Sequence, residues 1–240
     1  MEPSSKTLSL PVAIVIAGLV IGLAIIWTNT KNMPPSPSAG NTATTGQQGN
    51  TVAVDSSKVD TTGDPFIGSA SAPVTIDYWF DYQCPFCQQD EENSIPQLIT
   101  DYVDTGKVKL VFKDYSFLGA DSNTLGQYAR AVWAVAPNQF YAWHKAIFDN
   151  QGTENTGWAT QAKILSITTN TLGAVDAAQI ATLVKTNGAT YQKEMDADKA
   201  QGTSLGINGT PAMIIGTQLV SGAVPYTQIQ AAVTVSLGNK

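Results

Sequence analysis

The only two cysteines of this 240-residue chain, Cys84 and Cys87, lie in the stretch "FDYQCPFCQQDEE". A structural zinc site needs four ligands, and the chain adds a single histidine to these two thiols, which argues against zinc. A purely structural disulfide would close a very short loop and remove little entropy from the unfolded chain. The remaining interpretation is a redox-active pair, because two thiols at this spacing can exchange a disulfide.

The residues around the pair predict different roles for the two thiols. Pro85 suits the first position of a helix, so Cys84 is expected at the helix start, followed by Phe86 and, one turn in, by Cys87. Unpaired N–H groups and the helix dipole favour a thiolate there. We therefore expect Cys84 to attack and Cys87 to resolve the mixed disulfide.

The charges near the pair limit this expectation. Lowering a thiol pKa from about 8.5 to about 7 needs roughly 2 kcal/mol, near the upper limit of what a helix end supplies. No Lys, Arg or His occurs between Val59 and Gly106, whereas several acids lie close by in sequence. Further stabilisation of a thiolate would have to come from backbone donors or distant cations.

The elements that must position the cysteines form a strand, a helix and a strand. The apolar run Pro73 to Phe80 predicts a buried strand, and helical spacing of apolar residues continues from Cys84 to Val103. Pro96 should kink this helix. A second strand is expected over Lys107 to Tyr115, and this order favours a parallel pair of strands.

A block of helical patterns interrupts this α/β unit at about residues 119–204. Strand signals return over Pro211 to Gly222, where Gly216 and Thr217 separate two apolar runs and indicate a hairpin. Thr227 to Leu237 then predicts a closing helix. The sequence therefore predicts an all-helical unit inserted into an α/β domain that covers residues 64–240.

The chain before this domain reads as a membrane anchor and a tether. Residues 10–27 form an uncharged apolar run that as a helix spans about 27 Å, close to a bilayer core. A cleaved signal peptide is the competing interpretation. With residues 10–27 as an anchor, residues 1–9 would be a cytoplasmic tail. Residues 28–63, rich in Pro, Gly, Ser and Thr, would be a flexible linker.

The overall composition excludes some partners. The pI is about 4.6 and the net charge −6, and no cluster of Lys or Arg is visible, so nucleic acid is not expected as a partner. With 43% hydrophobic residues the chain can fill a core without a metal or cofactor, and we expect neither.

The stretches "DPFIGSASAPVTIDYWFDYQCPFC", "FYAWHKAIF" and "LGINGTPAMIIGTQLVSGAVP" together resemble bacterial DsbA-like thiol:disulfide oxidoreductases. The resemblance covers roughly Asp64 to Leu237. It implies a thioredoxin fold with an inserted all-helical domain, and Cys84 and Cys87 as the attacking and resolving cysteines. It also implies that Thr210 and Pro211 form the client-binding loop, and we expect a cis peptide bond between them.

Other conspicuous residues receive plainer interpretations. Many relatives carry an acid six positions before the first cysteine, where this chain has Tyr78, and the neighbouring Asp77 should face the opposite side of the strand. His144 is expected to have a packing or surface role. Trp79 and Tyr82 would line a peptide groove or pack in the core. The remaining acids are expected on a solvated helix face: Asp90, Glu91 and Glu92.

The resulting functional hypothesis is a membrane-anchored, single-pass enzyme whose catalytic domain lies outside the cytoplasm and introduces disulfides into exported proteins. Its partners would be these cysteine-containing clients and a membrane redox partner that regenerates the pair. Two alternatives remain open. One is a disulfide reductase or isomerase of the same fold, and the other is a tethered binding or chaperone-like module with a structural disulfide.

Overall fold

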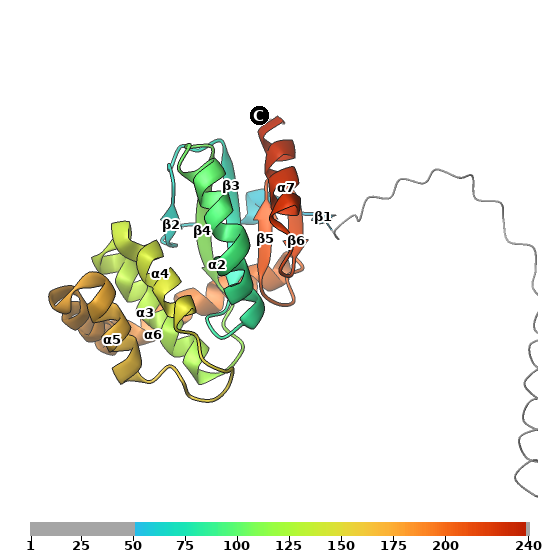
Figure 1. Cartoon of the computed structure of the whole chain (residues 1–240). Coiled ribbons are helices and arrows are strands. Elements are labelled where there is room, and N and C mark those ends of the chain that lie inside the picture. Colours follow the sequence, from blue (N-terminus) through green and yellow to red (C-terminus); the bar gives the residue numbers. More distant parts are fainter. Residues whose placement is uncertain (1–50, 239–240) are drawn as a thin grey trace, which may run out of the picture. The chain divides into compact units, whose positions relative to one another are not determined.

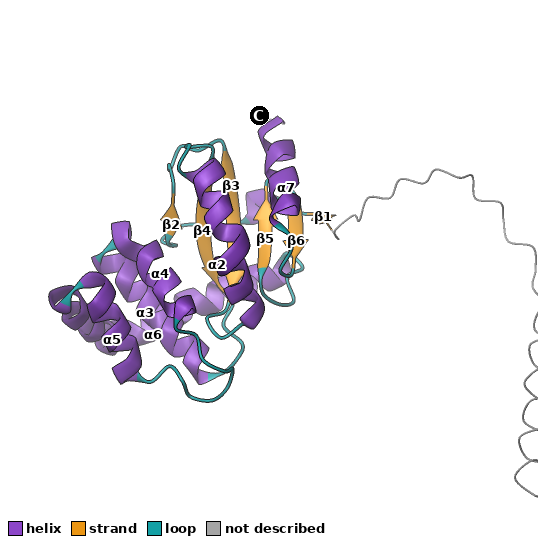
Figure 2. Cartoon of the chain, viewed as in Figure 1, coloured by secondary structure: helices purple, strands orange, loops and turns teal. Residues whose placement is uncertain are grey.

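The computed structural model describes residues 51–238, which fold around one mixed β-sheet (Figures 1 and 2). The strand order is β1-β6-β5-β3-β4-β2, and within it β3 and β4 are parallel while the other neighbours are antiparallel. The strands are β1 (Thr51–Ala53), β2 (Phe66–Ile67), β3 (Val74–Phe80), β4 (Val108–Asp114), β5 (Ala212–Ile215) and β6 (Gln218–Ser221).

The expected strand, helix and strand are present, and they place the cysteines at one end of the sheet. Helix α2 (Pro85–Leu98) connects β3 to β4. Pro96 lies inside α2, and a π-helical turn (Ile99–Val103) follows directly, so the helix widens after the proline. Gly106, with φ of +73°, then turns the chain towards β4, in a conformation that glycine adopts without strain.

The two faces of the sheet bury different side chains, because successive residues of a strand point in opposite directions. Ile76, Tyr78 and Phe80 of β3 pack into the larger core, together with residues of α2 and of helix α7 (Tyr226–Gly238). Trp79 faces the other side and packs with Ile214 of β5 in a smaller core. Trp79 and Tyr82 are both buried, so each is a core residue.

The helical block predicted at about residues 119–204 is confirmed as an insertion between β4 and β5 (Figure 2). The apolar stripe expected over Leu125, Tyr128, Val132 and Trp133 is buried at its first three residues and half-buried at Trp133. The helices are α3 (Ala120–Val135), α4 (Phe140–Asp149), α5 (Gln161–Leu172) and α6 (Ala174–Ser204).

A buried cluster of charged side chains joins the insertion to the sheet. Arg130 of α3 pairs with Asp64, Asp114 and Asp198, and Lys113 of β4 pairs with Asp64 and Asp198. The five residues come from the segment before β2, from β4, from α3 and from α6. Breaking one buried pair would leave a charge uncompensated, so the cluster fixes the two parts to each other.

The segment before β2 departs from the expected linker, which extended to residue 63. Thr51–Ala53 pairs with β6 at the edge of the sheet, and Val54 and Val59 pack against the smaller core. We predicted a tether because residues 28–63 hold few large apolar residues. Two valines and the exposed edge of β6 nevertheless give the last part of this segment a place on the sheet. The expected anchor, residues 10–27, lies outside the described residues. Within residues 51–238 there is no helix with the length and apolar character needed to cross a membrane.

Candidate functional site: a dithiol at the start of helix α2

Cys84 occupies the N-cap of α2, as predicted. Its backbone N–H donates to the carbonyl of Asp81 at 3.0 Å, which turns the chain from β3 into the helix, and Pro85 follows in the first helical turn. Cys84 is 4% exposed and Cys87 is fully buried. Both cysteines are thiols in this structure. A partner molecule can therefore reach Cys84 before it reaches Cys87.

The surroundings shift the two thiols in opposite directions. The pKa of Cys84 is lowered from 9.0 to about 6, first by its hydrogen bond with Cys87 and further by Thr210 and the backbone N–H groups of Phe86 and Cys87, against the effect of burial. Burial raises the pKa of Cys87 well above 9.0, and the neighbouring Cys84 raises it further. Backbone N–H groups thus supply part of the stabilisation of the Cys84 thiolate, which no residue close by in sequence supplies with a positive charge.

The loop before β5 faces the pair. The peptide bond between Thr210 and Pro211 is cis, as predicted. The Sγ atom of Cys84 lies 3.4 Å from the carbonyl oxygen of Thr210. The loop is held by β5, which starts at Ala212 and pairs with β3, and by a 2.8 Å hydrogen bond from the N–H of Gly222 to the Pro211 carbonyl. The sequence-predicted residues of the pair and the loop are therefore brought together.

Asp81 organises the chain leading to Cys84, a role that the sequence analysis missed. One carboxylate oxygen accepts hydrogen bonds from the N–H groups of Phe117 and Leu118 at 2.9 and 3.1 Å. The other accepts from the N–H of Gln83 at 2.8 Å and from the hydroxyl of Ser122 at 2.6 Å. The sequence feature that could have indicated this role is the position of Asp81 directly after a strand. An aspartate side chain in such a turn often accepts a hydrogen bond from the N–H two residues further on.

Glutamine side chains connect the insertion to the cysteine loop. The Nε2 atom of Gln151 donates to the carbonyls of Tyr82 at 2.8 Å and of Cys84 at 3.2 Å. Gln88 of α2 donates in turn to the carbonyl of Phe148 at 3.0 Å. No local sequence pattern pointed to these contacts, because each joins residues at least sixty positions apart.

The expectation of a solvated acidic face on α2 is wrong for two of its three residues. Asp90 and Glu91 are 2% and 1% exposed, and of the three only Glu92 is exposed. Glu91 is buried because the insertion supplies partners: His144 Nε2 lies 3.0 Å from Glu91 Oε1, and the hydroxyl of Tyr141 donates to Oε2 at 3.3 Å.

His144 is a core residue with polar partners on both ring nitrogens. Its Nδ1 atom shares a 2.9 Å hydrogen bond with the hydroxyl of Tyr82. With Nε2–H donating to the Glu91 carboxylate, Nδ1 is the acceptor and Tyr82 the donor. The imidazole, which packs edge-on against Phe80, therefore links the residues before and after the cysteines. The packing role predicted for His144 is confirmed, and the hydrogen bonds are an addition to it.

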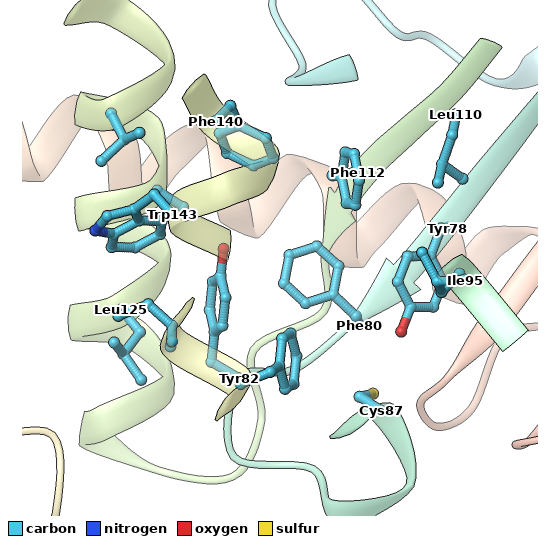
Figure 3. Close-up of a cluster of buried hydrophobic side chains, with 14 of the residues drawn as sticks. Tyr78, Phe80, Tyr82, Cys87, Ile95, Leu110, Phe112, Leu125, Phe140 and Trp143 are labelled. Carbon is cyan, nitrogen blue, oxygen red and sulfur yellow. The ribbon is translucent and has the colours of Figure 1, made fainter. Parts of the chain in front are cut away.

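A buried phenol lies close to Cys87, and a second buried acid follows Cys87 by three residues on α2. In Figure 3 the hydroxyl of Tyr78 is directed towards the end of the core that holds Cys87. Burial, followed by the charges of Cys87, Glu91 and Asp90, raises the pKa of Tyr78 well above 10.0. Burial also raises the pKa of Asp90 to about 8, and Glu91 and Cys84 add to this effect. Tyr78 Oη and Asp90 Oδ2 have no hydrogen-bond partner among residues 51–238.

Asp77 does not take the place of an acid at position 78. The residues of β3 that contribute to the core around Cys87 are Val74, Ile76, Tyr78 and Phe80. Asp77 belongs to the alternate set that includes Trp79, so it points away from the cysteines, as the alternation predicted.

Two large apolar side chains remain exposed near the pair. Phe86, between the cysteines, is 59% exposed, and Phe117, whose N–H bonds to Asp81, is 46% exposed. Exposed aromatic side chains beside a reactive group are typical of a surface that contacts another protein.

The chain is similar to several known proteins. The thioredoxin family model matches residues 60–234. A probable disulfide bond formation protein D of Bacillus cereus is 28% identical over 155 residues, which cover 65% of this chain and 71% of that protein. Disulfide bond formation protein D of Bacillus subtilis is 25% identical over 178 residues, covering 74% of this chain and 79% of that protein.

Solved structures show the same fold. The crystal structure of oxidised BdbD from Bacillus subtilis superposes with a TM-score of 0.67 at 22% identity, covering 80% of this chain and all of that one. The thiol-disulfide exchange protein alpha-DsbA2 of Wolbachia pipientis superposes with a TM-score of 0.64 at 25% identity, covering 72% of this chain and 87% of that one.

The fold and its dithiol thus define the class of DsbA-like thiol:disulfide oxidoreductases, which are enzymes. The chain belongs to the thioredoxin family, with an all-helical insertion between β4 and β5.

Proposed function

We propose that this enzyme is an oxidant, held by residues 10–27 on the outer side of the cytoplasmic membrane, that passes a Cys84–Cys87 disulfide to cysteines of exported proteins. The observation that carries the proposal is the contrast between Cys84, which keeps a small exposed surface and has a lowered pKa, and the fully buried Cys87, which has a raised pKa. The names of the relatives from Bacillus, which are disulfide bond formation proteins, support the same direction.

The exchange runs in two balanced steps. A client thiolate attacks Sγ of Cys84 in the oxidised enzyme, so a mixed disulfide forms and Cys87 leaves as a thiolate that takes up a proton. A second client thiolate then attacks the client sulfur, which closes the client disulfide and releases Cys84 as a thiolate. The client loses two electrons and the enzyme gains them. A membrane redox partner must remove these electrons to restore the disulfide.

The lowered pKa of Cys84 favours the oxidising direction. A thiol of low pKa is a good leaving group in the second step, and its stable thiolate favours the reduced enzyme over the disulfide. The loop of Thr210 and Pro211 would hold the client, with the backbone of Thr210 pairing to an extended client segment beside Cys84. Phe86 and Phe117 would contact apolar client side chains.

Trapping of mixed disulfides tests the roles of the cysteines. In Cys87→Ala the Cys84 thiolate can still attack a client disulfide and release one client thiolate, but no Cys87 remains to resolve the mixed disulfide, so covalent complexes should accumulate in cells and disappear on reduction. Cys84→Ala is the matched control and should trap none. Trapping by Cys84→Ala but not by Cys87→Ala would reverse the assignment, and trapping by neither variant would favour the non-catalytic module.

Titration of the pair in a glutathione buffer separates an oxidant from a reductase or isomerase. Strongly oxidising enzymes of the DsbA class have reduction potentials of about −120 mV, whereas the reduction potential of thioredoxin is about −270 mV. We expect a value at the oxidising end, and a value near that of thioredoxin would support the reductase alternative.

Protease accessibility tests the topology. Protease added to spheroplasts should release the folded domain, since the domain would lie outside the membrane. Protection of the domain in spheroplasts, together with cleavage after the membrane is opened by detergent, would contradict the proposed orientation.

A further inference from the structure

A cavity of about 430 Å³ lies at the end of the sheet opposite the cysteines. Its lining includes Pro73, which precedes β3, and Thr217, in the turn between β5 and β6. Cys84 follows the other end of β3. The cavity is therefore separate from the dithiol.

The wall of the cavity contains a carboxylate without a partner. Asp77 is 4% exposed, and its Oδ1 atom has no hydrogen-bond partner among residues 51–238. Burial raises the pKa of Asp77 to about 7, against the attraction of Lys113 and Lys109 and with smaller contributions from Asp64 and Asp198. A buried carboxylate in this state is destabilising unless something donates a hydrogen bond to it.

The nearby cations do not fill this role. Lys113 is paired with Asp64 and Asp198, and the ammonium group of Lys109 lies 4.5 Å from the centre of the Phe66 ring. Neither lysine lines the cavity. Within the described part of the chain, no cation therefore pairs with the Asp77 carboxylate.

The rest of the lining defines what would fit. The hydroxyls of Ser56 and Thr217 and the amide of Gln218 offer hydrogen-bond acceptors, while Val59 and Pro73 offer apolar surface. Asp77 is the one acidic residue among the described residues of the lining, and no group of three or more metal-ligating side chains gathers anywhere in residues 51–238. A single carboxylate surrounded by hydroxyls suits an organic cation better than a metal ion.

We propose that this cavity binds a small organic ammonium ion, which pairs with Asp77, donates to the hydroxyls around it and packs its carbon atoms against Val59 and Pro73. The pairing is a charge-assisted hydrogen bond in a mostly buried place, where such bonds are strongest. Ser56 and Val59 lie ahead of the residues matched by the family model, so part of the wall is built by a segment outside the matched region.

The test is an NMR titration of the isotope-labelled full chain in detergent micelles, with n-butylammonium as the probe and n-butanol as its neutral counterpart. We expect saturable shifts of the amide signals of Thr75 and Thr217 with the ammonium probe only. Asp77→Asn should weaken binding about tenfold or more, because it removes the charge and keeps the shape. Asp104→Asn removes an exposed charge elsewhere and should leave binding unchanged.

Two further measurements keep the result decisive if Asp77→Asn folds poorly. Thr217→Trp places a large side chain at the mouth from an exposed turn position and should abolish the shifts. Binding to the unaltered chain should strengthen as the pH rises from about 5.5 to 8, since the carboxylate must lose its proton first. Equal binding of n-butanol, binding that survives both variants, or binding that weakens over this pH range would overturn the proposal.

Discussion

The chemistry of the pair depends on how two thiols separated by two residues differ in their surroundings. Cys84 shares a hydrogen bond with Cys87 and meets backbone donors at the start of α2, while Cys87 is enclosed by the core. The resulting pKa difference assigns a thiolate to Cys84 and a thiol to Cys87. Neither assignment requires a basic side chain.

The first prediction concerns the pH dependence of alkylation at Cys84. Only the thiolate reacts with iodoacetamide, and the pKa of Cys84 is lowered to about 6, so the rate should rise through pH 6 and level off above about pH 7. Stopped-flow measurement on the reduced enzyme provides the profile. A rate that still rises between pH 8 and 9 would show an unshifted thiol.

The same shift links the pH to the stability of the reduced enzyme. The folded pKa lies below the ordinary value of 9.0, so the contribution is fully present above pH 9 and is lost as the pH falls through about 6. The Cys84→Ala variant should lack this part of the pH dependence.

The second prediction concerns Asp90 as the proton partner of Cys87. Asp90 follows Cys87 by three residues on α2, on the same face of the helix, and its buried carboxyl holds a proton up to about pH 8. The leaving Cys87 needs a proton, and we expect the protonated carboxyl of Asp90, whose Oδ2 atom has no hydrogen-bond partner among residues 51–238, to supply it. Asp90→Asn should slow the reaction of the oxidised enzyme with a model dithiol about tenfold or more.

The control for this prediction is Glu92→Gln, which alters an exposed acid two residues further on. It should leave the rate unchanged. If Asp90→Asn and Glu92→Gln react equally fast at pH 7, Asp90 takes no part in the proton transfer.

Among the elements, the contact between α2 and α4 decides how firmly the cysteine helix is held. His144 bonds to Tyr82 before the pair and to Glu91 after it, and all three side chains are buried. The helix that presents the cysteines is therefore fixed by the insertion as well as by the sheet.

The third prediction follows from this contact. His144→Ala removes a buried ring and leaves the Glu91 carboxylate without its nitrogen partner, so it should lower the free energy of unfolding by about 3 kcal/mol. Lys145→Ala, at the partly exposed neighbouring position, is the control and should cost less than about 0.5 kcal/mol. Denaturant unfolding of both variants measures the difference, and equal losses would contradict a specific role for His144.

These elements also show what the sequence could and could not predict. β3, α2, β4 and the helical block followed from local periodicity, and the cysteine pair and its loop from recognisable residues. The burial of Asp90 and Glu91 could not follow, because α2 has only weak apolar periodicity and the partner of Glu91 lies on a helix 53 residues away. β1 was missed because a short edge strand depends on the strand it joins.

At the scale of the whole molecule, the fold buries more acids than it pairs. The cluster between sheet and insertion contains three aspartates and two bases, and burial raises the pKa of Asp114 to about 7 in spite of Arg130. Asp77, in the cavity at the far end of the sheet, has a similarly raised pKa. Between about pH 4 and pH 7, both carboxyls are therefore protonated in the folded chain and ionised in the unfolded chain.

The fourth prediction is that the oxidised enzyme loses stability as the pH rises towards neutral. The folded pKa of Asp77 and of Asp114 exceeds the ordinary 3.8, so their contribution is complete below about pH 4 and is lost as the pH rises through about 7. Urea unfolding at several pH values measures this trend. Asp77→Asn should flatten it, and stability that increases steadily from pH 5 to 8 would contradict it.

The 31-residue helix α6 constrains how the chain can change in length. It begins inside the insertion and ends against the sheet, where Asp198 joins the ion cluster and Gly202 leaves room for the Trp79 indole. A Cβ atom at Gly202 would lie 2.8 Å from the indole nitrogen. Deleting one residue near the middle of α6 would rotate everything after it by about 100° and move both residues off their partners. Natural or grafted versions of the insertion should therefore differ in length in their connecting loops. The length of α6 should stay constant, because this helix sets the distance between the insertion and the sheet.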